Sequence, residues 1–371
     1  MSVFIIRRLM QSLLVVVIMS FLVFMAIYQI GDPTDLLVSP DAPQEEIERV
    51  KRDFGVDLPF HEQYLKFVGK ALQGDLGNSF VMNDPALQLI LQKMPATLEL
   101  AFSALFLSIV LGIPLGVYAG LRHGTFSSKL IMSGSILGFS LPTFWVGLMM
   151  IMIFAVYLGW LPSTGRGETV EVLGIEVSFL TWDGLTHLFM PALNLALLKI
   201  SLVIRLARAG VRETIHMDYI KFARAKGLSY RRVILLHLMK NIMIPIVTVI
   251  GLEFGGLIAF SVITETIFAW PGMGKLIIES ILLLDRPMVV AYLMITVMMF
   301  IIINLLVDIL YSILDPLRQK HRLAVAPHQR RQQHGYRPHF SDLPLIFWRA
   351  GLRSSDWSLP RLSFSSRSSL P

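Results

Sequence analysis

The hydrophobic positions of this chain gather into six long runs, which shorter and more polar segments separate. A helix needs roughly 20 mostly apolar residues to cross about 30 Å of hydrocarbon, and each run meets that length. The pattern therefore predicts an all-α membrane protein with six transmembrane helices, an even number that puts both termini on one side. The predicted spans are 9–30, 98–121, 131–158, 188–207, 241–263 and 289–312.

The first run follows Arg7 and Arg8, as the apolar core of a signal peptide does. It is too long for that core, and the residues after it, Gly31-Asp32-Pro33, do not form a small-x-small cleavage site. We expect residues 1–30 to be a retained signal-anchor helix.

The orientation follows from the positive charges, because cytoplasmic loops carry an excess of Lys and Arg. Segment 205–240 has nine basic residues against two acidic ones, whereas 31–97 has six against eleven and 159–187 has one against four. Both termini are therefore predicted to be cytoplasmic. Residues 31–97 would form a periplasmic segment, and 98–318 a core with five spans.

The C-terminal segment 319–371 is rich in Arg, Ser, Pro and His, with little periodicity. We expect a basic, disordered tail near anionic lipid. One version of the disordered-tail interpretation is that a non-native extension of the reading frame encodes these residues.

The composition excludes several classes of protein. Hydrophobic residues make up 54% of the 371 positions and charged residues 16%, too few charges for a soluble chain of this length. The net charge of +7 is spread between apolar runs, which argues against a nucleic-acid partner. There is no cysteine, and the nine histidines lack metal-binding spacing, so neither a metal site nor a cofactor is predicted.

The nearest approach to a phosphate-binding loop is 271–275, Pro-Gly-Met-Gly-Lys. A Walker A loop needs a further glycine five positions before the one that precedes the lysine, and Ser or Thr after the lysine. Ala269 and Leu276 occupy those positions. We therefore predict that this chain is not an enzyme and that any ATP hydrolysis belongs to another polypeptide.

A few polar residues interrupt the apolar runs, and such residues usually face a protein interior or an aqueous path. Asn304 and Asp308 share a helix face, which allows either an interhelical hydrogen bond or a role in a transport path. Glu253 allows a structural bond, for example to Lys199, or a position lining the path. These dispersed groups, with Glu99 at the edge of its span, are fewer than a proton-coupled carrier would need.

Loop 209–240 is predicted to form a helical elbow. Apolar residues at helical spacing indicate a short amphipathic helix, Lys226-Gly227 is a C-terminal stop, and Ser229 can begin a second helix. The helix would rest on lipid headgroups or dock a soluble partner. The predicted apolar stripe consists of Ile215, Tyr219, Phe222 and Ala223.

Segment 218–229, Asp-Tyr-Ile-Lys-Phe-Ala-Arg-Ala-Lys-Gly-Leu-Ser, resembles the cytoplasmic signature of dipeptide and oligopeptide ABC-importer permeases. His237, Asn241 and Ile244-Pro245 continue the resemblance. It implies that the loop inserts into a groove of an ATPase subunit, with Ala223 or a close neighbour as the motif's first alanine and Gly227 as its glycine. The implied coupling residues are Tyr219, Ala223, Lys226, Gly227 and Pro245.

The resemblance covers residues 1–318, and 265–274, Glu-Thr-Ile-Phe-Ala-Trp-Pro-Gly-Met-Gly, resembles the family's turn before the last span. Two features depart from the family pattern: Glu253, where a neutral residue is usual, and the long tail. The residues implied for the periplasmic turn are Glu265, Trp270, Pro271, Gly272 and Gly274.

The resemblance implies the type I ABC-importer permease fold in the bacterial inner membrane, working by alternating access. The implied partners are a second homologous permease subunit, two ATP-binding subunits, a periplasmic peptide-binding protein and the lipid bilayer. Relatives carry dipeptides, longer peptides, nickel chelates or glutathione, so the solute stays open and no substrate-binding residue is predicted. The alternative is a secondary, ion-coupled peptide transporter without an ATPase.

Overall fold

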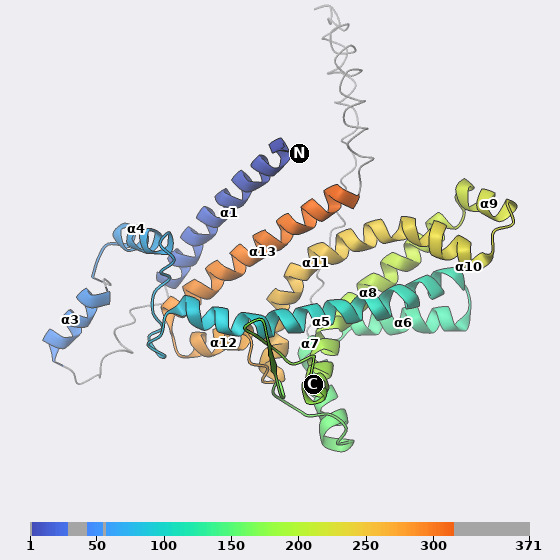
Figure 1. Cartoon of the computed structure of the whole chain (residues 1–371). Coiled ribbons are helices and arrows are strands. Elements are labelled where there is room, and N and C mark those ends of the chain that lie inside the picture. The colour runs from blue at the N-terminus through green and yellow to red at the C-terminus, as the bar shows by residue number, and fades with distance from the viewer. Residues whose placement is uncertain (1, 29–42, 55–56, 315–371) are drawn as a thin grey trace, which may run out of the picture. The chain divides into compact units, whose positions relative to one another are not determined.

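The computed structural model describes residues 2–28, 43–54 and 57–314, and these are almost entirely helical (Figure 1). By length and composition, four helices can cross a membrane, or five if one bent pair counts as a single span. The four are α5 (Ala86–Leu121), α8 (Trp182–Thr214), α13 (Arg286–Leu314) and the continuous run of α10 (Tyr230–Arg232), η2 (Val233–Leu238) and α11 (Met239–Ile267).

The N-terminal helix α1 (Ser2–Tyr28) packs against α13. Its described apolar stretch, Met10–Ala26, is shorter than a full span, so the predicted count of six stays a prediction. The predicted basic tail 319–371 lies outside the described residues.

The prediction of one continuous span over 131–158 was wrong. The segment forms α6 (Phe126–Ser140) and α7 (Thr143–Met150), which continues into the π-helix η1 (Ile151–Tyr157), and the two halves meet at 105°. The break falls at Leu141-Pro142, where Leu141 has φ −81° and ψ 135°. Proline disfavours the helical conformation in the residue before it, which explains the extended backbone there.

Three glycines bring α5 and α8 into close contact. Gly112, Gly116 and Gly120 recur every fourth residue and so share one face of α5. A Cβ at Gly116 would lie 2.6 Å from the Ile204 carbonyl oxygen and 2.7 Å from the Ala207 Cβ. Small residues at this spacing allow membrane helices to approach closely enough for van der Waals packing.

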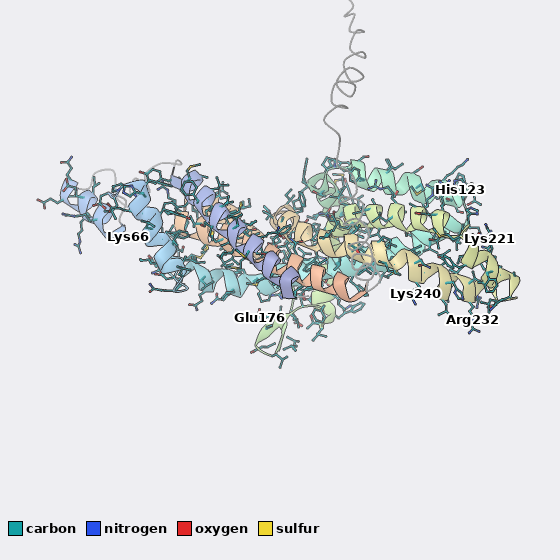
Figure 2. The ribbon with its side chains drawn as sticks, turned by 90° about the horizontal axis from the view of Figure 1, so that it is seen from above. Lys66, His123, Glu176, Lys221, Arg232 and Lys240 are labelled. Atoms are coloured by element: carbon teal, nitrogen blue, oxygen red, sulfur yellow. The ribbon has the colours of Figure 1, made fainter. Side chains whose placement is uncertain are left out.

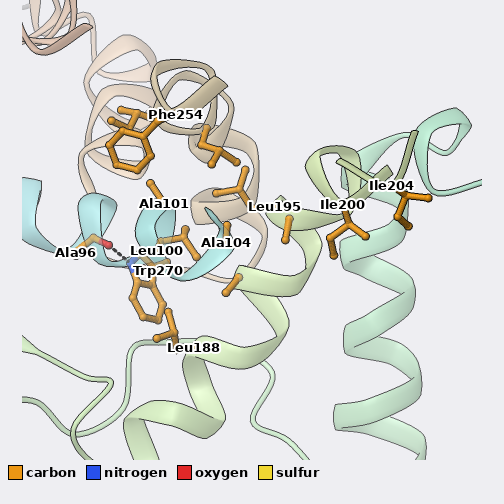
Figure 3. Close-up of a cluster of buried hydrophobic side chains, with 14 residues drawn as sticks. Ala96, Leu100, Ala101, Ala104, Leu188, Leu195, Ile200, Ile204, Phe254 and Trp270 are labelled. Atoms are coloured by element: carbon orange, nitrogen blue, oxygen red, sulfur yellow. Dashed lines mark hydrogen bonds between the residues drawn. The ribbon is translucent and has the colours of Figure 1, made fainter. Parts of the chain in front are cut away.

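The buried core forms where α5, α8 and α11 meet (Figure 3). Its central side chains include Leu100 of α5, Leu195 of α8, and Phe254 and Leu257 of α11. The indole of Trp270, fully buried, completes the cluster at one end.

Within segment 31–97 the structure has helix α3 (Gln44–Phe54), followed by α4 (Phe60–Ala71). Aromatic rings connect α4 to α1, with the Phe24 and Phe67 ring centroids 5.4 Å apart. Gly74 and Gly77 have positive φ and lie in the segment that connects α4 to α5.

One element departs from the all-α prediction. Strands β1 (Val170–Val172) and β2 (Ile175–Val177) pair antiparallel across a two-residue turn. Both turn residues, Leu173 and Gly174, have positive φ, the conformation that suits the twist of a tight hairpin. The sequence signal was weak because each strand has three residues.

Candidate functional site

The predicted elbow is present at the end of α8. The chain turns after Thr214 into α9 (Asp218–Ala225), and α10 begins at Tyr230. After α9, the Gly227 N–H donates to the Arg224 carbonyl (2.9 Å) and the Leu228 N–H donates to the Ala223 carbonyl (3.3 Å). These two bonds form a Schellman motif, which satisfies carbonyl groups that the end of a helix leaves without partners.

Gly227 provides the left-handed residue that this motif requires. Its φ is +76°, as its position after Lys226 predicted. A Cβ there would have no atom within 4 Å. A side chain at this position would therefore strain the backbone and change the outer surface of the elbow without clashing with the rest of the chain.

The inner face of α9 packs against the bundle, but the predicted stripe was partly wrong. Ile220 and Ala223 are the buried residues of α9, while Tyr219 and Phe222 are exposed. The spacing alone did not distinguish Ile220 from its neighbour Tyr219. The two buried side chains join a cluster with residues of α5, α8, η2 and α11: Ile113, Val203, Ala207, Val211, Val233, Leu238, Ile242, Ile246 and Ile250.

The outer face of α9 carries aromatic and charged groups. The Lys226 Nζ lies 4.6 Å from the centroid of the Phe222 ring. Lys221 donates to the Asp218 carboxylate, and this bond holds the pKa of Asp218 below its ordinary value. Figure 2 shows Lys221 at the same end of the bundle as Arg232.

Tyr219 links the elbow to the span that follows it. Its hydroxyl accepts a hydrogen bond from the Asn241 Nδ2 at 2.6 Å, and partial burial raises the pKa of the phenol. Pro245 lies beyond the elbow, inside α11, where its side chain is exposed.

At the opposite end of α11, the predicted turn forms around the carboxylate of Glu265. One carboxylate oxygen accepts bonds from the hydroxyls of Thr97 (2.8 Å) and Ser261 (2.9 Å). The other accepts from the backbone N–H groups of Gly274 (2.6 Å) and Lys275 (3.1 Å). These two N–H groups belong to the first turn of α12 (Met273–Leu282), so the fully buried Glu265 caps the start of that helix.

The other residues of the turn fit closely around this carboxylate. A Cβ at Gly272 would lie 2.4 Å from a Glu265 carboxylate oxygen, and one at Gly274 would lie 2.6 Å from the Val262 Cα. Pro271 separates Gly272 from Trp270, whose indole N–H donates to the Ala96 carbonyl at 2.9 Å (Figure 3). The turn therefore joins α11, α12 and α5.

The predicted intramembrane polar residues differ in their surroundings. Lys199 of α8 forms an ion pair with Glu253 of α11, as one of the two interpretations of Glu253 expected. Asn304 donates to the Phe300 carbonyl one turn earlier in its own helix. Asp308 lies outside the residues whose side chains the structure describes.

An ion pair that the sequence did not predict fixes the β-hairpin to α5. The Arg166 guanidinium contacts the Glu99 carboxylate at 2.6 Å, and the Ser178 and Phe179 N–H groups donate to the other oxygen of Glu99. A lone arginine in segment 159–187, opposite an acid at the edge of a span, was the available signal. Within the described ranges, no three His, Asp or Glu side chains come together to hold a metal ion.

The described part of the chain thus combines long apolar helices with a helical elbow at a cation-rich end. The model of the family "Binding-protein-dependent transport system inner membrane component" matches residues 112–320, and the model of the N-terminal part of such components matches residues 1–101.

Curated relatives agree. The di/tripeptide transport system permease protein DppB of Pseudomonas aeruginosa is 37% identical over 77% of this chain and 89% of its own length. The oligopeptide transport system permease protein AppB of Bacillus subtilis is 37% identical over 85% and 99%. The glutathione transport system permease protein GsiC of Escherichia coli is 33% identical over 84% and 97%.

This chain belongs to the family of binding-protein-dependent transport system inner membrane components. It is a multi-pass inner-membrane protein and the permease subunit of an ABC importer, in which ATP hydrolysis occurs in a separate subunit.

The Glu265 turn generates a stability prediction. In Gly274→Ala the new Cβ meets the backbone of Val262, which cannot move independently of α11, so we expect a loss of about 1–3 kcal/mol. The matched control is Gly69→Ala in α4, where a Cβ meets nothing within 4 Å. The control should be neutral or stabilising by up to about 1 kcal/mol. Thermal unfolding of the detergent-purified chain, followed by tryptophan emission, measures both, and equal midpoints would contradict the close fit.

Proposed function

We propose that this permease subunit carries short peptides and that the elbow, residues 209–240, forms the surface on which an ATP-binding subunit docks. Two of the three relatives above carry peptide transport in their names, and the third is named for glutathione, itself a tripeptide. Nickel chelates remain the other solute class that the sequence resemblance suggested.

The arrangement of α9 is the observation that carries the docking proposal. A helix that rests on lipid turns its apolar face outward to the acyl chains. In α9 the inward face holds the buried Ile220 and Ala223. The outward face mixes charged groups with exposed aromatic rings, a composition found at protein interfaces: Asp218, Tyr219, Lys221, Phe222 and Arg224. An outward face of this kind suits a polar protein surface better than a bilayer.

The proposed assembly contains two permease subunits, two ATP-binding subunits and a periplasmic binding protein. This subunit pairs with a second homologous permease, and two ATP-binding subunits dock on the cytoplasmic elbows. A periplasmic peptide-binding protein delivers the solute from outside. Closure of the ATP-binding subunits moves the elbows, and the spans alternate between inward- and outward-facing arrangements. A secondary transporter has no soluble subunit to dock, so the elbow favours the ABC mechanism.

The proposed topology has six spans with both termini in the cytoplasm, α1 being the first span and α6–η1 the bent third one. The distribution of charge supports this orientation. Lys221, Arg232 and Lys240 lie toward one end of the helices (Figure 2). Segment 31–97, on the other side in this topology, has eleven acidic residues against six basic ones.

A pair of glycine variants tests the docking surface. We expect Gly227→Asp to leave membrane insertion normal but to reduce ATP-dependent uptake by about tenfold or more, because the side chain strains the Schellman motif and adds a charge to the docking face. Gly124→Asp is the matched control, since Gly124 also has positive φ (+88°) with no atom within 4 Å of its Cβ position. It lies in the neighbouring 122–125 turn, outside the elbow.

The readouts are uptake by proteoliposomes that hold the complete importer, and co-purification with the ATP-binding subunit. Equal uptake by the two variants would contradict the docking surface. Ala223→Asp should also lose co-purification, because it buries a charge between α9 and the bundle.

Cysteine accessibility tests the topology, because the chain has no cysteine of its own. We expect cysteines that replace Gln73 and Glu171, both exposed, to react with a membrane-impermeant maleimide in intact spheroplasts. Cysteines at Ser127 and Ser229 should react only after the membrane has been permeabilised. Labelling of Ser229→Cys in intact spheroplasts would reverse the orientation.

A further inference from the structure

A charged pair lies within two of the predicted membrane-spanning segments. Glu253 of α11 is near the midpoint of the predicted span 241–263, and Lys199 of α8 is near the midpoint of the predicted span 188–207. In the proposed topology the pair therefore lies well inside the bilayer, where the hydrocarbon stabilises charge poorly.

The pair is not sealed inside the chain. The side chain of Glu253 is 37% exposed and that of Lys199 is 14% exposed. Gly256, one turn after Glu253, leaves the space beside them open. A Cβ at Gly256 would meet two atoms within 4 Å, the Lys199 Nζ at 3.6 Å and a Glu253 carboxylate oxygen at 3.7 Å. Because Gly256 has no side chain, it leaves both charged groups uncovered on its side of α11.

Lipid is a poor neighbour for this opening. A charged side chain facing acyl chains at mid-membrane costs about 2.5–3.5 kcal/mol even on the lowest scale. The buried cluster of α5, α8 and α11 already supplies the apolar contacts between these helices, so packing does not require an ion pair here. A charged pair that is open at the membrane centre is what an aqueous path through the protein would contain.

We propose that Lys199 and Glu253 hold the two charged termini of a short peptide as it crosses the membrane, an inference that rests on the proposed function in peptide transport. The peptide's ammonium group binds the Glu253 carboxylate, and its terminal carboxylate binds the Lys199 ammonium group. Glu253 exchanges the Lys199 ammonium group for that of the peptide, and Lys199 exchanges the Glu253 carboxylate for that of the peptide. No charge inside the membrane is therefore left without a partner. No bond forms or breaks.

The proposed exchange requires the two protein charges to separate by about the length of the peptide that they hold. An extended chain spans at most ~3.6 Å per residue, or about 7 Å for a dipeptide. The flexible four-carbon stem of Lys199 can move its ammonium group away from Glu253 by a comparable distance. Without a peptide the two side chains pair with each other, which is the arrangement in the structure.

A charge swap separates this role from a structural one. The double variant Lys199→Glu with Glu253→Lys retains an ion pair between α8 and α11 but reverses its polarity. We expect normal membrane abundance and normal co-purification with the second permease. We expect uptake of radiolabelled dialanine by proteoliposomes holding the complete importer, with ATP and the binding protein, to fall by about tenfold or more.

A second variant blocks access while leaving both charges in place. Gly256→Leu should cover the pair and reduce dialanine uptake, whereas Gly134→Leu, at a position with no atom within 4 Å of its Cβ, should not. The substrate provides a further readout. N-acetyl-dialanine lacks the ammonium group, so Glu253→Gln should lower its uptake less than it lowers dialanine uptake.

The outcomes distinguish the two levels of the argument. Normal uptake by the charge swap, or equal effects of Glu253→Gln on the two substrates, would overturn this inference and leave the peptide importer intact. Loss of the second permease from the charge swap would show that the pair is a subunit contact, and would also overturn it. Absence of ATP-dependent uptake of any dipeptide by the wild-type importer would overturn the proposed function itself.

Discussion

The close contact between α5 and α8 is the constraint on which the rest of the structure depends. In a bilayer, apolar side chains gain nothing by leaving lipid for another helix, so association relies on close packing and satisfied polar groups. Gly112, Gly116 and Gly120 provide that packing, because each lets the backbone or short side chains of α8 approach where a Cβ would clash. The elbow follows directly from the end of α8, so its position is set by this contact. Ile220 and Ala223 of α9 then pack into a cluster that also contains Val203 and Val211 of α8.

The two ends of the bundle satisfy polar groups in different ways. At the end that carries the elbow, the Schellman motif after α9 satisfies carbonyl groups with backbone N–H donors and needs one glycine, Gly227. At the opposite end, the Glu265 carboxylate accepts the N–H groups that begin α12 and also binds Thr97 of α5. Both ends therefore connect several helices. In the proposed mechanism, a movement of the elbow would be passed to the helices that pack against α9. The partly exposed Lys199–Glu253 pair lies between these ends.

Much of this arrangement could be predicted from the sequence, because apolar runs and turn residues act locally. The mainly helical class and the left-handed Gly227 agree with expectation, and the ion pair of Glu253 agrees with one of the two interpretations of that residue. The break at Leu141-Pro142 was also a local signal, but the apolar run on both sides outweighed it. Ile220, and not the predicted Tyr219, is buried in α9, because the buried side of this helix is the one that packs against η2 and α11. That packing could not be read from the spacing of apolar residues alone. The partners of Glu265 were beyond prediction, because Thr97 lies far from it in the sequence.

The central claim is that the outward face of α9 contacts the ATP-binding subunit, and photo-crosslinking tests it most directly. The photoreactive residue p-benzoylphenylalanine would replace Phe222, which is 60% exposed on α9, or Phe260, which is 58% exposed on the membrane-spanning α11. In the complete importer in membranes, our account predicts an adduct with the ATP-binding subunit from position 222 and none from position 260. An importer that transports normally but gives no such adduct from position 222 would contradict it.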